Sequence, residues 1–390
     1  MSNRSARIVY LLLLTAVLFW SYRNPHYNWD MIPYIAQARM FKEHDVRTIH
    51  AEIYAEIRKE VPSDKYDELT GAAGVAANSA LYRSDMARDY LHFAEQLPFY
   101  STKPLYVMCI YLLQAVGFGA MLATLIPSLV AYVILALLVF EWVGHFVGGF
   151  YRLTCASLIA FSAPVLLLPR LPTPDSLSTA LVLLALYFLL EKQSAAVCSG
   201  LLLLSLYART NNVVLAVFVL GYLALWAKGS IRLSYLQGGV LLVVCMASVS
   251  AINHFSGFYG WATLFHQSLL GLLNTPGESL VHISMRTYLV TLKQGLFFST
   301  FTGFLSQFVF LGVLALLVSG ATKNNERLLV YRHLTLLVLA SLVAYYLLMP
   351  SMTRWFEHER FVVPQYLFLA ISCVVAVLTR LTRVAEPAAS

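Results

Sequence analysis

Asp30 is the only acid in the segment NPHYNWDMIPY, which follows directly on the first apolar run of the chain. A carboxylate placed where an apolar run ends loses hydration free energy unless it reacts or is paired with a cation. It can act as a general base that takes a proton from a hydroxyl, or it can form an ion pair with an arginine from another segment. The residues leave both interpretations open.

Lysine and arginine residues occur in other short polar segments between the apolar runs. A guanidinium presents paired N–H donors that match phosphate oxygens, so such residues could hold a phosphate. From the residues alone, a surface ion-pair cluster is the favoured interpretation for Arg354 and Arg360, which flank two acids, and Arg209 in a turn between helices could extend along the apolar surface towards water. The residues concerned are Lys103 in TKPLY, Arg209 in YARTNN, and Arg354 and Arg360 in PSMTRWFEHERF.

Asp175 is a second isolated acid, in the segment PRLPTPDSL. It follows Pro174 and precedes an apolar helical run, which is the position of a helix N-cap. From the residues alone, capping is the favoured interpretation.

The elements that must position these residues are membrane helices. Of the 390 residues, 59% are hydrophobic and 12% are charged, which is far more apolar than soluble domains are. Apolar runs long enough to span a bilayer recur, and the alternating strands of a membrane barrel are lacking. The sequence predicts an all-α polytopic membrane protein of roughly 10 to 11 membrane helices in a single domain, residues 1–390. After the N-terminal run, the apolar segments are 104–118, 122–141, 152–169, 176–190, 195–208, 212–227, 235–252, 297–318, 329–349 and 361–379.

Basic residues indicate the sidedness of these helices. Arg4 and Arg7 precede the first apolar run, which ends in aromatics and predicts an uncleaved anchor with its N-terminus inside. Further basic residues fall in alternate connections, which predicts cytoplasmic N- and C-termini and accounts for the net charge of +7. Parity then requires one helix within 104–141 to be interfacial or re-entrant, and the shorter one, beginning at Pro104, is the expected one. The basic residues in these connections are Arg152, Lys192, Lys228, Arg232, Lys323, Arg327, Arg332, Arg380 and Arg383.

The long loop 21–103 differs from the rest of the chain. It holds 12 of the 20 acids and 10 of the 27 basic residues, so it is net acidic while the remainder is basic. Apolar residues recur at helical spacing from Val46 to Val61 and from Tyr82 to Leu97, before Pro62 and Pro98. We expect two amphipathic helices that lie along the extracytoplasmic membrane surface.

Several function classes lose support. The five cysteines lie inside apolar runs without metal-ligand spacing, which is typical of packing residues. No HExxH, GxSxG or P-loop motif with its required context is present, and no compact basic patch indicates nucleic acid. No DxD motif indicates a divalent cation, so we expect no required cofactor.

In the order of its apolar segments and short motifs, the chain resembles the GT-C glycosyltransferases. It is similar in particular to the branch of protein O-mannosyltransferases and lipid A aminoarabinose transferases. The resemblance covers residues 1 to about 230 and the segment 354–364. It rests on an acid after the first helix, KPLY at a helix start, PRLPTPDSL, YARTNN and ERFVVP. The chain departs from the O-mannosyltransferase pattern at Met31, where that pattern has a second acid.

The resemblance implies a membrane enzyme that takes a sugar from a polyprenyl-phosphate donor and gives it to a lipid, glycan or protein acceptor. It implies a catalytic role for Asp30, donor-phosphate contacts from Lys103, Arg209, Arg354 and Arg360, and acceptor or sugar contacts from Tyr27, Trp29, Tyr34 and Asp175. The charge pattern predicts a site on the extracytoplasmic face, and the compact chain without an endoplasmic-reticulum retention signal favours a bacterial plasma membrane over the endoplasmic reticulum. The alternatives are a secondary transporter, a lipid-linked O-antigen ligase or polymerase, and a structural membrane scaffold.

Overall fold

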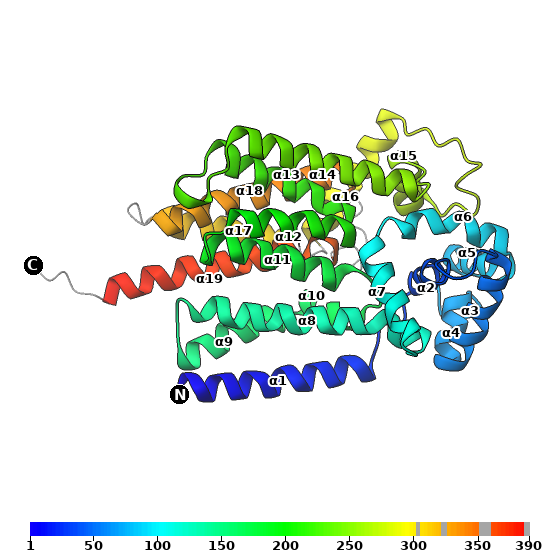
Figure 1. Cartoon of the computed structure of the whole chain (residues 1–390), viewed down its shortest axis with the longest axis horizontal. Coiled ribbons are helices and arrows are strands. Elements are labelled where there is room, and N and C mark those ends of the chain that lie inside the picture. The colour runs from blue at the N-terminus through cyan, green and yellow to red at the C-terminus, as the bar shows by residue number, and fades with distance from the viewer. Residues whose placement is uncertain (302–304, 321–325, 351–359, 386–390) are drawn as a thin grey trace, which may run out of the picture.

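The computed structural model describes residues 1–301, 305–320, 326–350 and 360–385. Over these ranges the chain forms 19 α-helices with a few short 3₁₀ and π turns and no β-strand, which confirms the predicted all-α class. Figure 1 shows a bundle of long helices side by side, with a group of shorter helices at one end. The bundle helices are α1 (Asn3–Arg23), α8 (Ala120–Gly144), α9 (Gly149–Ala160), α11 (Asp175–Glu191), α12 (Ala195–Ala208), α13 (Val213–Leu225), α14 (Tyr235–Phe255), α16 (Met285–Phe301), α17 (Leu305–Gly320), α18 (Glu326–Leu348) and α19 (Val363–Ala385).

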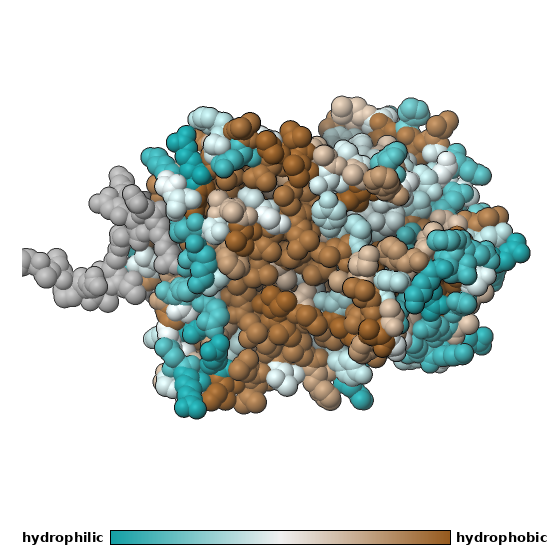
Figure 2. All heavy atoms as spheres, in the orientation of Figure 1, coloured by the Kyte–Doolittle hydropathy of each residue, from teal (hydrophilic) through white to brown (hydrophobic). Residues whose placement is uncertain are grey.

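The bundle is that of a membrane-embedded protein. Among the described residues, five helices are long and apolar enough to cross a bilayer: α1, α8, α14, α18 and the one that includes Arg360–Arg380. A bent pair, Gly149–Ala160 with Ala163–Arg170, supplies a sixth if it counts as one span. Figure 2 shows, on the face in view, a broad hydrophobic belt across the bundle between two more hydrophilic ends. The total of 10 to 11 spans therefore stays a prediction.

Helix α7 (Pro104–Ala115) begins at the expected proline and has 12 residues. At about 1.5 Å per residue it is shorter than the roughly 20 residues that a bilayer requires. Several helices of the bundle, such as α9, α12 and α13, are also this short, so the interfacial or re-entrant placement of α7 stays a prediction. Pro104 stands at the first helical position, where its missing N–H costs no hydrogen bond.

The shorter helices form a lobe at one end of the bundle, on the right of Figure 1. They are α2 (Met31–Arg39), α3 (Val46–Glu60), α4 (Ser63–Thr70), α5 (Ala77–Arg88) and α6 (Tyr90–Ser101). The first predicted amphipathic helix is α3, with Ile49, Ile53 and Ile57 buried. These side chains pack with Met86 and Phe93, and with residues at the start of α8, in one buried core. The apolar stripes therefore face one another and the bundle, while the location of the two segments along the membrane surface stays a prediction.

The second predicted amphipathic helix is in fact two. Asp89 ends α5 and caps α6, because its carboxylate accepts a hydrogen bond from the Leu91 N–H at 2.8 Å. Pro98 lies inside α6 and does not terminate it. The helical period of apolar residues runs across this break, so periodicity alone did not reveal it.

Two carboxylates of α3 join the lobe to the bundle. Glu56 accepts a hydrogen bond from the Ala120 N–H at 3.1 Å, and Glu60 accepts one from the Met121 N–H at 2.7 Å. Both N–H groups belong to the first turn of α8, where backbone donors lack partners within the helix and negative charge is favourable. The lobe is thereby fixed at the end of the bundle where α7 and α8 meet.

Five segments converge between the lobe and the bundle. The link from α1 to α2 carries Asp30, and the link from α6 to α7 carries Lys103. The start of α11, the end of α12 and the residues just before α19 carry Asp175, Arg209 and Arg360. These positions are distant in sequence, yet the fold brings them to one end of the bundle.

Candidate active site

Asp30 is held at both carboxylate oxygens. Its Oδ2 accepts a hydrogen bond from Nη2 of Arg360 at 2.7 Å, and its Oδ1 accepts one from the hydroxyl of Tyr100 at 3.0 Å. Burial by itself would raise the pKa of this carboxyl. The positive charge and hydrogen bond of Arg360, the Tyr100 hydroxyl and the charge of Lys103 outweigh burial, so the pKa of Asp30 lies below its usual value. The carboxylate is therefore ionised and already paired.

Arg360 connects Asp30 to the second acid. Its Nε lies 3.4 Å from Oδ2 of Asp175, and its side chain is only 8% exposed. Its Nη1 is buried without a hydrogen-bond partner. Its Nε makes no hydrogen bond either, although it is within ion-pair distance of Asp175. The surface ion-pair interpretation is therefore wrong for Arg360, which is an interior residue.

Asp175 is almost wholly buried at the start of α11. Its Oδ1 lies 2.5 Å from Nη2 of Arg209, and its Oδ2 accepts a hydrogen bond from the Thr173 hydroxyl at 2.6 Å. Its side chain makes no capping hydrogen bond, so the favoured N-cap interpretation is wrong. The carboxylate instead lies between two guanidinium groups, because buried charges need partners of opposite sign.

Arg209 ends α12 and turns inwards. Its guanidinium lies over the ring of Phe361, 4.2 Å from the ring centroid, and its side chain is 8% exposed. The interpretation that Arg209 extends along the apolar surface towards water is therefore wrong. Its Nε is buried and unpartnered, like Nη1 of Arg360. The four charged residues thus form a continuous chain of ion pairs in the order Asp30, Arg360, Asp175, Arg209.

Lys103 adds a third cation beside this chain. It precedes α7, its Nζ donates to the carbonyl oxygen of Phe99, and it lies 5.6 Å from the centroid of the Tyr100 ring. Burial, followed by the charge of Arg209, lowers the pKa of Lys103 to about 7, although Asp30 and Asp175 act in the opposite direction. Its amine is therefore readily protonated or deprotonated near neutral pH.

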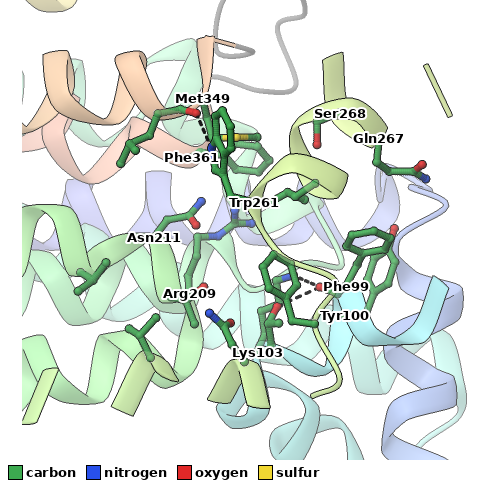
Figure 3. A pocket seen from close by; sticks show the side chains of 18 of the residues that line it. Phe99, Tyr100, Lys103, Arg209, Asn211, Trp261, Gln267, Ser268, Met349 and Phe361 are labelled. Atoms are coloured by element: carbon green, nitrogen blue, oxygen red, sulfur yellow. Dashed lines mark hydrogen bonds between the residues drawn. The ribbon is translucent and has the colours of Figure 1, made fainter. Parts of the chain in front are cut away.

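A cavity of about 390 Å³ opens beside these groups. Asp30, Tyr34, Lys103, Arg209 and Arg360 line it. Figure 3 shows Arg209, Lys103, Phe99, Tyr100 and Trp261 around the cavity, with the Lys103 amine next to the Phe99 carbonyl oxygen. The remaining wall includes apolar side chains of the bundle, namely Val213, Val214, Val249, Leu348 and Met349.

Other predicted site residues lie elsewhere. Asp175 is behind the cavity, in contact with the arginines that line it. Trp29 is 5% exposed and packs in the core of the lobe, as an edge-on neighbour of Tyr82 and Tyr100. Tyr27 packs against the same core. Neither aromatic lines the cavity, so neither is placed to stack on a sugar in it. Arg354 lies outside the described residues.

The residues alone did not single out Tyr100, which donates to Asp30. It stands three positions before Lys103 in PFYSTKPLY, so both lie at the junction of α6 and α7. That proximity was the one available signal. Thr173 was likewise missed, although it is two residues from Asp175. Trp261 has no local motif at all and reaches the cavity from α15 (Trp261–Phe265).

The arrangement combines an acid, three cations and an apolar wall in one cavity. With Lys103 protonated, Lys103, Arg209 and Arg360 exceed Asp30 and Asp175 by one positive charge, which suits a singly charged anion. No group of three His, Cys, Asp or Glu side chains that could hold a metal ion occurs among the described residues. Comparisons of the chain with protein-family models, with curated proteins and with solved structures find no match.

Proposed function

We propose that this protein is a membrane glycosyltransferase that moves a sugar from a polyprenyl-phosphate donor to an acceptor hydroxyl. One observation carries the proposal: Asp30, Lys103, Arg209 and Arg360, from four segments distant in the sequence, line a single cavity beside an apolar wall. A phosphate, a sugar and the first isoprene units of a lipid need this combination of cationic, polar and apolar surface.

The donor phosphate would bind to the three cations. Arg360 and Arg209 line the cavity, and Nη1 of Arg360 and Nε of Arg209 are buried without hydrogen-bond partners. An unsatisfied buried donor costs free energy that a phosphate oxygen would recover if the side chain turned towards it. As the bond between the anomeric carbon and the phosphate oxygen breaks, negative charge grows on the leaving phosphate. Fixed guanidinium groups stabilise that charge without rearrangement.

Asp30 would act on the acceptor. The acceptor oxygen attacks the anomeric carbon as the carbon–phosphate-oxygen bond breaks, and its proton passes to the Asp30 carboxylate. The products are the glycosylated acceptor and a polyprenyl monophosphate. A positioned general base contributes about 10²- to 10⁴-fold to such a step. The acceptor belongs to the class of lipid, glycan or protein hydroxyls.

The proposal includes a membrane setting. Basic connections at the end of the bundle away from the lobe favour a cytoplasmic location for that end, so the cavity would open on the extracytoplasmic face. A bacterial plasma membrane is the proposed compartment. A site at the boundary of the hydrophobic belt would meet a lipid-linked sugar where the headgroup leaves the bilayer.

The test is sugar transfer or release by the purified protein from a panel of radiolabelled polyprenyl-phosphate sugars. We expect one donor to be consumed by the wild type, and consumption to fall by about 10²-fold or more in Asp30→Asn. Thermal stability measured in parallel would show that the variant is folded. Gln237→Ala is a matched control, because Gln237 caps the start of α14 outside the cavity. If every donor survives while a labelled solute accumulates in proteoliposomes, the protein is a transporter instead.

A further inference from the structure

The two oxygens of Asp30 have different partners, and this asymmetry extends the proposed function. Tyr100 donates to Oδ1 at 3.0 Å and Arg360 donates to Oδ2 at 2.7 Å. A carboxylate with both oxygens occupied, one of them by a guanidinium, is a weak base. Asp30 therefore cannot take a proton efficiently in the arrangement observed, and something must first remove one of its partners.

Arg360 is the partner that can leave. It already divides its guanidinium between Asp30 and Asp175, it lines the cavity, and its Nη1 is buried without a hydrogen-bond partner. An anion that entered the cavity would offer oxygens to this same guanidinium. Asp175 would still have Arg209 and Thr173 as partners if its contact with Arg360 weakened, whereas Asp30 would be left without a guanidinium partner.

Tyr100 is the partner that stays. Burial and the neighbouring Asp30 carboxylate raise the pKa of Tyr100 well above its usual value, so its hydroxyl remains a donor at any working pH. Its ring is packed edge-on against Tyr34 and Trp29, with centroid distances of 5.1 and 6.1 Å. A donor held by such packing keeps its position when a neighbouring charge moves.

Resting on the proposed function, we propose that the donor phosphate takes over Arg360 and frees Oδ2 of Asp30, while Tyr100 acts as a positioning residue that holds Oδ1. The base is then exposed only when a donor is bound, and the freed oxygen is aimed by a fixed hydroxyl. In the absence of a donor the carboxylate stays paired and does not act on water or an acceptor.

Further charged and titratable groups lie around Asp30 among the described residues. The charge of Lys103, before α7, acts on Asp30, and the charge of Asp30 acts on the hydroxyls of Tyr34 of α2, Tyr82 of α5 and Tyr106 of α7, with Asp175 and Arg209 beyond Arg360. Lys103 matters most among these, because an incoming anion also favours its protonated form. A measurement must therefore report on Asp30 itself and not on total proton uptake.

Infrared difference spectroscopy of the purified full-length protein provides that readout. The carbonyl band of a protonated carboxyl group is titrated with pH, and the band that disappears in Asp30→Asn is assigned to Asp30. If that variant fails to fold, ¹³C-aspartate labelling of the wild type identifies aspartate bands without a substitution. The probe is farnesyl phosphate, and farnesol is the matched neutral control.

We expect farnesyl phosphate to raise the titration midpoint of Asp30 by roughly 1 to 3 pH units, the range produced by a neighbouring arginine, and farnesol to leave it unchanged. In Tyr100→Phe the midpoint should rise further, and the increment should be larger with farnesyl phosphate than without it, because Tyr100 is then the only donor on Asp30. Tyr106→Phe is the control, because the Tyr106 hydroxyl donates to the Thr124 carbonyl and not to Asp30.

The outcomes separate the two proposals. If farnesyl phosphate binds but leaves the midpoint in place, the exchange of Arg360 is wrong and the proposed function stands. The exchange of Arg360 is also wrong if Tyr100→Phe raises the titration midpoint of Asp30 by the same amount with and without farnesyl phosphate. Repulsion between the phosphate charge and Asp30 would then be enough to explain the effect of farnesyl phosphate. If calorimetry detects no binding of farnesyl phosphate to the wild type, both the exchange and the polyprenyl-phosphate site are wrong.

Discussion

The carboxylate of Asp30 and the guanidinium of Arg360 form an ion pair at 2.7 Å although 330 positions separate them in the chain. Asp30 lies in the link between α1 and α2, and Arg360 lies shortly before α19 begins at Val363. The ion pair therefore ties the first and last parts of the described fold together at the cavity. Both side chains are largely buried, so the pair is shielded from water and salt.

Removal of Arg360 should be far more costly than removal of Asp30. Arg360→Met would leave Asp30 without its cation and weaken the compensation of Asp175, and loss of one partner of a buried pair costs about 3 to 5 kcal/mol. Asp30→Asn keeps the size of the side chain and a hydrogen-bonding group at each oxygen position, so we expect a smaller loss. Thermal unfolding in detergent compares the two. Equal destabilisation would contradict the shared role of Arg360.

The exposed ion pair of Lys65 and Glu68 in the lobe is the control for that comparison. Pairs of this kind contribute about 0 to 1 kcal/mol. Lys65→Gln should therefore change the melting temperature little under the same conditions. A large effect at this position would mean that the assay responds to lobe unfolding in general and not to the buried network.

Acid should selectively weaken the wild type. The pKa of Asp30 is lower in the folded protein than its usual value, so its contribution to stability is present above the unfolded-state pKa of about 3.9 and is lost as pH falls through the folded value. Asp30→Asn lacks this contribution at every pH. The stability difference between wild type and Asp30→Asn should therefore shrink below about pH 4, as measured by unfolding at a series of pH values. A difference that is constant down to pH 2 would contradict this assignment.

Lys103 should have the opposite effect on stability. Its pKa is lowered to about 7 in the folded protein, so the folded state binds this proton less tightly than the unfolded state does. The resulting destabilisation is complete below pH 7 and is relieved as pH rises towards the unfolded value of about 10.4. Lys103→Met should therefore be more stable than the wild type at pH 6, with a smaller gain at pH 9. The same pair of unfolding curves at each pH provides the measurement, and a gain independent of pH would point to packing alone.

The sequence alone predicted the fold class well but predicted few of the contacts between site residues. Composition and apolar runs predicted the all-α membrane bundle. The isolated charges at the ends of apolar segments marked Asp30, Lys103, Arg209 and Arg360 as candidates, and the family resemblance implied their site roles; all four line the cavity. A charge that ends an apolar run is costly, and that cost is visible without a structure. Asp175 was misinterpreted because a capping position and a buried ion pair look alike in one dimension.

Tyr100, Trp29 and the split between α5 and α6 show what local patterns could not reveal. A tyrosine hydroxyl that meets a carboxylate 70 positions away has no sequence signature. Trp29 is beside Asp30 in the chain, yet it packs into the lobe core while Asp30 faces the cavity, because successive residues before a helix point in different directions. The break at Asp89 lies within a continuous apolar period, so only the capping side chain distinguishes it.

Asp30 and Arg209 should be energetically coupled although the chain of ion pairs places Arg360 and Asp175 between them. In Arg209→Met, Asp175 keeps only Arg360 as a cationic partner. The contact of Arg360 with Asp175 should then become stronger, and its contact with Asp30 weaker. The cost of Asp30→Asn should then be smaller in the Arg209→Met background than in the wild type. Residues within one ion-pair network show interaction energies of about 0.5 to 3 kcal/mol, whereas independent sites add within about 0.5 kcal/mol. A double-mutant cycle of unfolding free energies measures the interaction energy between Asp30 and Arg209 directly. In the control cycle Lys65→Gln replaces Asp30→Asn, and its effect should simply add to that of Arg209→Met. Strict additivity of Asp30→Asn and Arg209→Met would mean that the four charges act as two separate pairs, and the transfer of Arg360 from Asp30 to an incoming anion would then lose its structural basis.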